Sequence, residues 1–389
     1  MSAPELELSI DGLAAGGDGV GRGPDGRVVF VPATVPGDRV RVQVVQEHRR
    51  YLRGRLREVL RAGGDRVEPR CPVFGSCGGC SWQHVAYPAQ LRAKRALLCD
   101  ALQRIGGLRV PEPLPMHASP RSYGYRSRAR VHVHGGRVGF LRARSHELCP
   151  VSHCPVLEPA LDALLEELSD RPSGDGIVQL AAGEDGRVAC SAGSRKQALL
   201  VSNGEGSLES SAGVFVQGNP GLRGPLARAV VEAAGREGRC LELYAGIGFF
   251  TLSLAARFGH LVVVEASRRA LRHLRANLSS AGIHHVQVRC EPVEGMLRKP
   301  GPSALQPDVI VLDPPRVGLP GGSAERLGGL GARRIVYVSC DPATLARDLR
   351  QLTALGYKLE RVEGFDLFPQ TAHVEAVATL SAGREAGKR

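Results

Sequence analysis

The residue with the clearest chemical potential is a cysteine at the end of an apolar run. Residues 334–340, Arg-Ile-Val-Tyr-Val-Ser-Cys, predict a buried strand that ends at Cys340, and Asp341-Pro342 then begins a predicted helix. Proline is well tolerated at this point, because the first N–H groups of a helix have no intrahelical partner. The helix dipole and those N–H groups stabilise a thiolate, whereas the charge of Asp341 opposes one. We therefore predict that Cys340 is a nucleophile, with a pKa that the pattern does not fix.

A second pattern predicts a nucleotide site. Leu241–Gly248 is a strand that runs into a turn containing Gly246 and Gly248, and the next strand ends at Glu265, 19 residues after Gly246. An acidic side chain at that position can accept hydrogen bonds from both ribose hydroxyls. The third glycine of the dinucleotide fingerprint is missing. We therefore expect a nucleoside with an amino-acid tail, S-adenosylmethionine, rather than a dinucleotide.

The same edge of the predicted sheet receives Asp313-Pro314-Pro315-Arg316 at the end of a further strand. Ligands of open α/β sheets bind at this carboxyl edge. Methyltransferases that act on amino groups carry an aromatic residue where this chain has Arg316, a difference that argues against amino-group chemistry.

Methylation of carbon 5 of uracil gives a reason for a thiol and a base to occur together. A thiolate that adds to carbon 6 turns carbon 5 into an enolate carbon able to accept a methyl group, and a base must then remove the proton at carbon 5. Glu375 near the end of the chain is the candidate base, and His373 is its rival.

Three cysteines form a cluster with the spacing Cys71-x5-Cys77-x2-Cys80, in a glycine-rich segment. Structural zinc sites usually show paired C-x2-C knuckles, and here there is one. Three clustered cysteines with a distant fourth suit a four-iron cluster. From spacing alone the fourth ligand is Cys149 or Cys154, and zinc stays an alternative.

The positive charge lies in the first part of the chain. Residues 1–150 contain 24 basic and 13 acidic side chains, so they carry +11 of the total net charge of +12. Such asymmetry is typical of a module that binds a polyanion such as RNA. No apolar stretch is long enough for a membrane helix, and the N-terminus does not resemble a secretory signal. We expect a cytoplasmic protein without a membrane partner, in which cysteines bind metal or catalyse rather than form disulfides.

The elements that must position these residues fall into three parts. Residues 4–64 predict closely spaced short strands, typical of a small β-barrel, with a basic rim of Arg49, Arg50, Arg53, Arg55 and Arg57. Residues 88–105 predict a helix, and residues 123–140 predict a strand with one basic face that includes Arg128. From residue 213, strands alternate with helices, as in a doubly wound parallel sheet, and the last expected strands are 365–369 and 373–380.

Together these residues resemble the RNA uracil-5-methyltransferase family whose members carry an N-terminal TRAM barrel and an iron–sulfur cluster. The resemblance covers nearly the whole chain, and its most specific part is Ser-Cys-Asp-Pro-Ala-Thr-Leu-Ala-Arg-Asp at 339–348 combined with the cysteine cluster. The other matching segments are 17–21, 29–38, 77–84, 125–128, 139–140, 145–146, 154–155, 215–219, 313–316 and 368–375.

The resemblance implies a TRAM barrel over residues 1–65, a central iron–sulfur domain of α+β type over 66–212, and a Rossmann-like class I methyltransferase domain over 213–389. It implies Cys340 as nucleophile, Glu375 as base and a [4Fe–4S] cluster. The implied cluster ligands are Cys71, Cys77, Cys80 and Cys154, and the implied donor-site residues are Gln217, Tyr244, Glu265 and Asp313, beside the turn of Gly246 and Gly248. Ala245 and Phe249 depart from the family pattern in that turn.

The substrate that the resemblance favours is ribosomal RNA, most specifically 23S RNA, methylated by a monomeric enzyme. Transfer RNA is the alternative substrate. A protein that binds RNA through the barrel without catalysis is the alternative of another class, and retention of Cys340 and Glu375 argues against it. A radical iron–sulfur enzyme would require C-x3-C-x2-C, which the sequence lacks.

Overall fold

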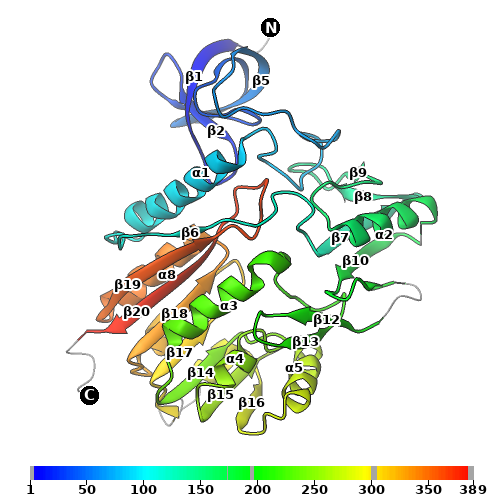
Figure 1. The fold of residues 1–389 in the computed structure, drawn as a ribbon. Coiled ribbons are helices and arrows are strands. Elements are labelled where there is room, and N and C mark those ends of the chain that lie inside the picture. Colours follow the sequence, from blue (N-terminus) through cyan, green and yellow to red (C-terminus); the bar gives the residue numbers. More distant parts are fainter. Residues whose placement is uncertain (1–3, 173, 193–196, 299–304, 384–389) are drawn as a thin grey trace.

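The N-terminal strands close into a small barrel, as predicted. The computed structural model describes residues 4–172, 174–192, 197–298 and 305–383 (Figure 1). The barrel order is β1-β2-β3-β5-β4. Its strands are β1 Glu5–Leu13, β2 Gly19–Arg22, β3 Val28–Val31, β4 Arg39–Glu47 and β5 Tyr51–Arg61. Alternate residues such as Ile10, Val40 and Val42 fill the interior, as the two-residue period of a strand requires.

After the barrel the chain forms the cysteine-bearing segment and then helix α1 (Tyr87–Asp100), which continues as the wider turn η1 (Ala101–Ile105). This is the helix predicted over 88–105. Figure 1 shows α1 between the barrel and the C-terminal sheet. The short strand β6 (Met116–His117) then joins that sheet beside β19.

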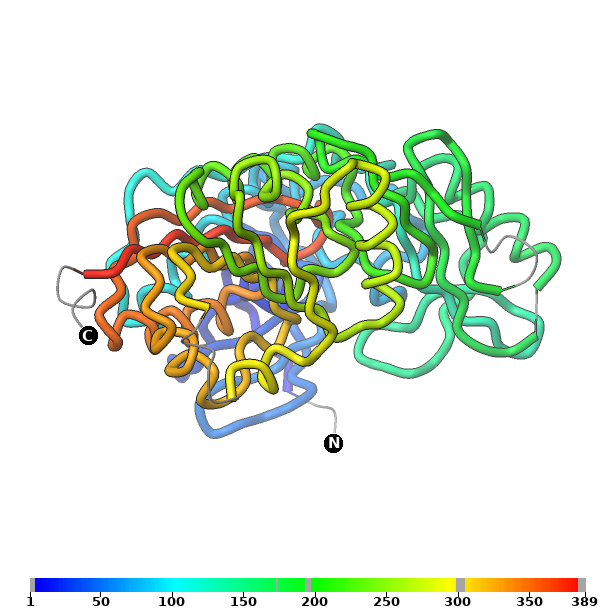
Figure 2. Tube along the Cα trace, turned by 90° about the horizontal axis from the view of Figure 1, so that it is seen from below, coloured from blue at the N-terminus to red at the C-terminus, as the bar shows by residue number. Residues whose placement is uncertain are grey.

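A second sheet, of order β11-β10-β7-β8-β9, forms the central region, which extends to one side of the C-terminal region in Figure 2. Its strands are β7 Arg128–His134, β8 Arg137–Leu141, β9 Leu148–Pro150, β10 Gly176–Ala182 and β11 Val188–Cys190, and α2 (Pro159–Asp170) packs against it. The predicted strand over 123–140 is therefore a hairpin of β7 and β8.

The basic face predicted for this strand is partly wrong. Arg130 is exposed, but Arg128 turns inward and donates hydrogen bonds to Ser210 Oγ (2.7 Å), Ser211 O (2.9 Å) and Val214 O (2.6 Å). Burial, and to a lesser extent the positive charge of Arg223, lowers the pKa of Arg128 to about 9. Arg128 therefore ties the central sheet to the segment that leads into the C-terminal domain.

The C-terminal region is a doubly wound sheet, as predicted, of order β16-β15-β14-β17-β18-β20-β19-β6. Strands β14 to β18 run parallel and β20 is antiparallel to both neighbours. The strands are β14 Arg239–Leu243, β15 His260–Glu265, β16 Val286–Cys290, β17 Val309–Leu312, β18 Arg334–Ser339, β19 Tyr357–Phe365 and β20 Glu375–Ala382. The expected strand over 365–369 is wrong, because β19 ends at Phe365 and the chain enters a loop.

Helices cover both faces of this sheet. One face packs against α3 (Pro220–Ala234), α4 (Thr251–Ala255) and α5 (Arg268–Ser280). The other packs against α1, α6 (Val293–Arg298), α7 (Ser323–Gly328) and α8 (Pro342–Ala354). The hairpin of β12 (Leu199–Ser202) and β13 (Ser207–Ser210) contacts α3 and α5. Among the described helices, none has the length and apolar character needed to cross a membrane.

Strand order reverses between β14 and β17, and ligands of open α/β sheets bind at the carboxyl edge beside such a reversal. The turn after β14, the loop after β17 and the end of β18 all lie at this edge.

Candidate active site

Cys340 follows β18 directly and precedes α8, as predicted. Asp341 is the N-cap of α8, and its Oδ1 accepts hydrogen bonds from the N–H groups of Ala343 (2.9 Å) and Thr344 (3.0 Å). These are the N–H groups that were expected to stabilise a thiolate. Asp341 therefore competes with Cys340 for the helix terminus in addition to opposing it by charge.

Three side chains from two strand ends lie near the Cys340 thiol, which itself follows a third strand. Burial above all, together with the carboxyl groups of Glu375 and Asp313, raises the pKa of Cys340 to about 11 against the opposing effect of Arg316. Cys340 follows β18, Asp313 and Arg316 follow β17, and Glu375 begins β20. The structure thus brings the predicted nucleophile and the predicted base into one site, with the thiol protonated at neutral pH.

Glu375 is 2% exposed, and its strand position opposes Phe365 on β19. Burial raises the pKa of Glu375 well above its usual value, the charge of Asp313 adds to this, and Arg316 opposes it. Burial also raises the pKa of Asp313 to about 7. A carboxylate withdrawn from water in this way is a stronger base than one in solvent.

His373, the rival base, contacts a different group. The Arg316 guanidinium donates to the imidazole ring, with its NH2 nitrogen 2.7 Å from Nδ1 and 2.9 Å from Nε2. Withdrawal from water, and then the positive charge of Arg316, lowers the pKa of His373 to about 4. A ring with so low a pKa is a weak base, so the lowered pKa of His373 favours Glu375 as the base.

The turn after β14 has the backbone that a close-approaching ligand requires. Gly246 and Gly248 have φ of 58° and 91°, values that favour glycine. Tyr244 also has a positive φ, 63°, which costs about 1–3 kcal/mol in a residue with a side chain. Its hydroxyl donates to Glu294 Oε1 at 2.8 Å, and its N–H donates to Val264 O at 3.0 Å. These two contacts hold the strained residue beside the glycines.

Glu265 ends β15 and faces this turn. Its Oε2 accepts from Gly246 N at 2.8 Å and its Oε1 from Ser267 N at 2.6 Å. Gln217, in the segment before α3, is buried, and no described residue provides a hydrogen-bond partner for its Oε1. An orphaned buried acceptor is unfavourable unless a ligand or water satisfies it. Gln217 is therefore available to a polar ligand.

The four cysteines implied as cluster ligands line one cavity of about 130 Å³. They are Cys71, Cys77, Cys80 and Cys154, and the cavity walls are otherwise mostly apolar, with Arg126 and Arg130 among them. Burial raises the pKa of Cys77 to about 11 and that of Cys154 to about 12. Within the described ranges, no group of three or more His, Cys, Asp or Glu side chains converges closely enough to hold one metal ion. The four thiols thus line the wall of a cavity and do not converge on the position of a single metal ion.

The spacing left Cys149 and Cys154 as alternatives for the fourth position. Cys149 lies in β9 and is buried in the core of the central sheet, whereas Cys154 lies in the cavity wall.

Comparison with known proteins identifies the family. The family model of the TRAM domain matches residues 4–56, that of tRNA (uracil-5-)-methyltransferase matches residues 303–382, and that of conserved hypothetical protein 95 matches residues 228–317. An uncharacterized RNA methyltransferase of Thermosynechococcus vestitus is 34% identical, over 97% of this chain and 98% of its own length. The 23S rRNA (uracil(1939)-C(5))-methyltransferase RlmD of Vibrio parahaemolyticus is 31% identical, over 90% of each chain.

The chain belongs to the RNA uracil-5-methyltransferase family. Its fold is similar to that of Pyrococcus abyssi tRNA (uracil-54, C5)-methyltransferase, solved in complex with S-adenosyl-L-homocysteine. The TM-score is 0.76 at 23% identity, over 96% of this chain and 100% of the other. The likeness thus extends over the described parts of the barrel, the central sheet and the C-terminal sheet of this methyltransferase.

Sequence reasoning missed one buried acid of this methyltransferase. Glu242 in β14 is 1% exposed, and neither carboxylate oxygen has a hydrogen-bond partner among the described residues. The Thr251 hydroxyl is also buried and acts to lower the pKa of Glu242. Burial raises the pKa of Glu242 to about 8. The available signal was a glutamate inside the apolar run Leu-Glu-Leu, two residues before the turn.

Proposed function

We propose that this methyltransferase transfers the methyl group of S-adenosylmethionine to carbon 5 of a uridine in 23S ribosomal RNA, through a covalent bond between Cys340 Sγ and carbon 6. The observation that carries the proposal is that four side chains come together at one edge of the C-terminal sheet. They are Cys340, Glu375, Asp313 and Arg316. The ribosomal substrate is favoured by the 31% identity with RlmD over 90% of both chains.

The first step belongs to Cys340. Its thiolate adds to carbon 6, and the electron pair of the 5,6 double bond moves onto carbon 5 and the adjacent carbonyl as an enolate. S-adenosylmethionine, when bound, supplies an electrophilic methyl group, which bonds to carbon 5 as the thioether leaves. The thiol must first release its proton to solvent, and Arg316 favours this because it lowers the pKa of Cys340.

Glu375 acts in the second half of the cycle. Its carboxylate removes the remaining proton from carbon 5, the double bond re-forms, and the carbon–sulfur bond breaks with its electron pair returning to Cys340. General-base catalysis is most effective when the pKa of the base approaches the working pH. Burial raises the pKa of Glu375 in that direction.

The donor would lie against the turn after β14. Each oxygen of Glu265 accepts one backbone hydrogen bond and keeps capacity for a ribose hydroxyl. The orphaned Oε1 of Gln217 suits a donor group of the ligand such as its ammonium. Tyr244, Gly246, Gly248 and Asp313 would complete the site.

We also propose that the four cysteines hold a [4Fe–4S] cluster, which binds one thiolate at each iron. A tetrahedral zinc ion needs ligands that converge on one atom, whereas these thiols line a cavity of about 130 Å³. Arg126 in the same wall would offset the negative charge of the loaded cluster. When bound, the cluster would cross-link these four positions, and the methylation cycle described above requires no electron from it.

The test supplies the protein with S-adenosylmethionine and with unmodified transcripts of 23S ribosomal RNA or of transfer RNAs, followed by mass spectrometry of the digested nucleosides. We expect 5-methyluridine in the ribosomal transcript. Methylation of transfer RNA alone would support the proposed carbon-5 methylation and would show that transfer RNA, not 23S ribosomal RNA, is the substrate. Tight RNA binding without 5-methyluridine in either RNA would contradict the proposal and favour a non-catalytic RNA-binding protein.

A further inference from the structure

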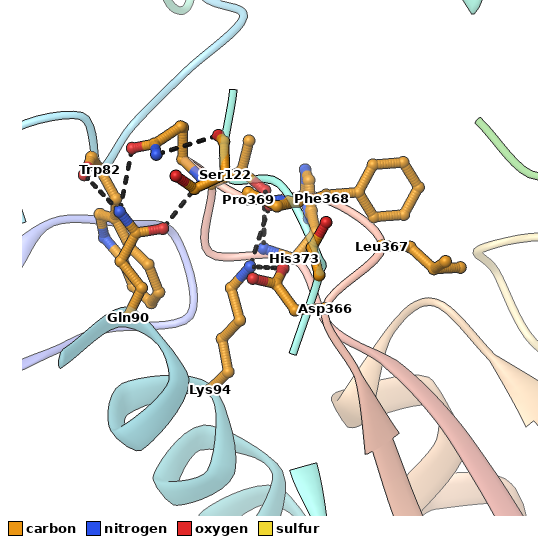
Figure 3. Close-up of polar contacts among 12 residues, drawn as sticks. Trp82, Gln90, Lys94, Ser122, Asp366, Leu367, Phe368, Pro369 and His373 are labelled. Carbon is orange, nitrogen blue, oxygen red and sulfur yellow. Dashed lines mark hydrogen bonds and ion pairs between the residues drawn. The ribbon is translucent and has the colours of Figure 1, made fainter. Parts of the chain in front are cut away.

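The loop that connects β19 to β20 carries His373 and ends at Glu375, and an array of polar contacts from α1 and the cysteine-bearing segment holds it (Figure 3). We call residues 366–374 the base loop. Its first residue, Asp366, directly follows Phe365, which is the register partner of Glu375. A displacement at either end of the base loop would therefore move the catalytic carboxylate.

The first clamp is an ion pair. Lys94 on α1 and Asp366 are both completely buried, and the Lys94 ammonium contacts Asp366 Oδ1 and donates to Phe368 O at 2.9 Å. Figure 3 shows the Lys94 side chain reaching from α1 to this part of the base loop. A buried ion pair adds little net stability compared with an apolar pair of similar size. Its contribution here is to position the loop, because the Lys94 ammonium fixes both Asp366 Oδ1 and the Phe368 carbonyl oxygen.

The second clamp is a pair of glutamines. Gln90 Oε1 accepts from the N–H of Gln370 at 2.9 Å, and Gln90 Nε2 donates to Gln370 Oε1 at 2.9 Å and to Trp82 O at 3.0 Å. The carbonyl of Gln370 accepts from the N–H groups of Ser81 (3.0 Å) and Trp82 (2.9 Å). Gln370 has a φ of 67°, which costs about 1–3 kcal/mol in a residue with a side chain. The clamp holds the base loop in this strained form.

The contacts continue toward the catalytic end. The Thr371 hydroxyl donates to Phe368 O at 2.7 Å and accepts from His373 N at 3.2 Å. The Phe368 carbonyl is thus shared between Lys94 and Thr371, and Thr371 in turn fixes the backbone two residues before Glu375. A continuous path of hydrogen bonds leads from α1 to the residues beside the base.

We propose that Lys94 and Gln90 are positioning residues for the general base: they hold the base loop so that Glu375 meets carbon 5 of the methylated adduct. This inference rests on the proposed function. Neither side chain needs to touch RNA or donor, so both are expected to act far more on elimination than on methyl transfer, which the base loop reaches only through Glu375 and the contact of His373 with Arg316. The reason is that Cys340 and the donor turn are carried by β18 and β14, outside the base loop.

The experiment separates the two halves of the cycle in a single turnover with radiolabelled S-adenosylmethionine. One rate is the appearance of methyl label in all RNA, and the other is the appearance of labelled RNA free of protein after denaturation. For Lys94→Met and for Gln90→Leu we expect the second rate to fall at least tenfold more than the first. Methylated protein–RNA adduct should then accumulate.

Arg92→Met is the matched control, because Arg92 lies on the same helix and forms an exposed ion pair with Asp65 at 2.7 Å. It should change neither rate. The double variant Lys94→Met/Asp366→Leu replaces the buried pair by two apolar side chains. We expect it to recover the melting temperature lost in Lys94→Met without recovering elimination, and it keeps the test available if Lys94→Met does not fold.

Equal slowing of both rates in Lys94→Met and Gln90→Leu, unchanged elimination, or elimination restored by the double variant would each overturn the inference. Failure of the proposed function gives a different result. In that case the wild-type protein forms no methylated RNA, or Glu375→Gln forms no adduct, whatever the α1 variants do.

Discussion

Methyl transfer should accelerate steeply with pH, because the nucleophile is mostly protonated. Burial raises the pKa of Cys340 to about 11, the neighbouring carboxyl groups of Glu375 and Asp313 act in the same direction, and Arg316 opposes them. The thiolate fraction falls tenfold for each pH unit below the pKa, so about one thiol in 3,000 is ionised at pH 7.5. We therefore expect the single-turnover rate of methyl transfer to rise about tenfold per unit between roughly pH 6.5 and 8.5.

The assay uses excess enzyme, saturating donor and an acid quench at each pH, and it counts methyl label in total RNA, including RNA bound to protein. Donor and RNA binding are measured separately and should vary little over this range. Arg316→Gln should lower the whole profile, since it removes the guanidinium that lowers the pKa of Cys340. A control with Cys340→Ser defines the background.

A flat profile for the wild-type protein would refute this reasoning. It would mean that the thiolate already exists in the resting site, or that the bound complex supplies a proton acceptor whose own protonation does not change over this range. An Arg316→Gln profile that coincides with that of the wild type would show that the guanidinium does not influence the thiol.

Four further results are expected. Cys340→Ser should bind the donor normally and lose methyl transfer. Glu375→Gln should accumulate a denaturation-resistant, methylated protein–RNA adduct, with elimination slowed about 10²–10⁴-fold. Turnover at the wild-type rate by either variant would contradict the role assigned to that residue. Protein purified without oxygen should contain about four irons and absorb broadly in the visible, and Cys154→Ser should reduce the iron content; one zinc without iron would exclude the cluster. Burial raises the pKa of Glu242 to about 8, so wild-type stability should fall as pH rises from about 4.5 to 8. The melting temperature of Glu242→Gln should therefore exceed that of the wild type at pH 8.5 and not at pH 4.5.

The local parts of the site followed from the sequence. A strand that delivers Cys340 to a helix start, and a turn that requires glycine at Gly246 and Gly248, are both determined within a few residues. The surroundings of Cys340, in contrast, could not be predicted from neighbouring residues in the sequence. Its pKa depends on Glu375 and Asp313, which come from other strands, and on an N-cap in which Asp341 occupies the helix N–H groups.

Burial of polar residues was the other property that local patterns did not disclose. Glu242 occupies a strand position that alternation would assign to either face, and only the packing of helices on both sides of β14 buries it without a partner. Cys149 and Cys154 were equivalent by spacing for the same reason. Pairing of β8 with β9 directs Cys149 into the core, and the chain then returns to bring Cys154 into the cavity wall.

The excess positive charge of residues 1–150 also has to be reconsidered in the folded chain. Lys94 is buried against Asp366, Arg128 donates to groups near β13, and Arg66 pairs with the buried Asp38. These cations stabilise contacts within and between the structural parts, so they add little to the field that a polyanion meets. Arg49 and Arg50, by contrast, are exposed between β4 and β5. Each phosphate contact that releases a counterion steepens the dependence of affinity on salt. Substituting Arg49 and Arg50 should therefore weaken that dependence more than substituting Lys94, Arg66 or Arg128.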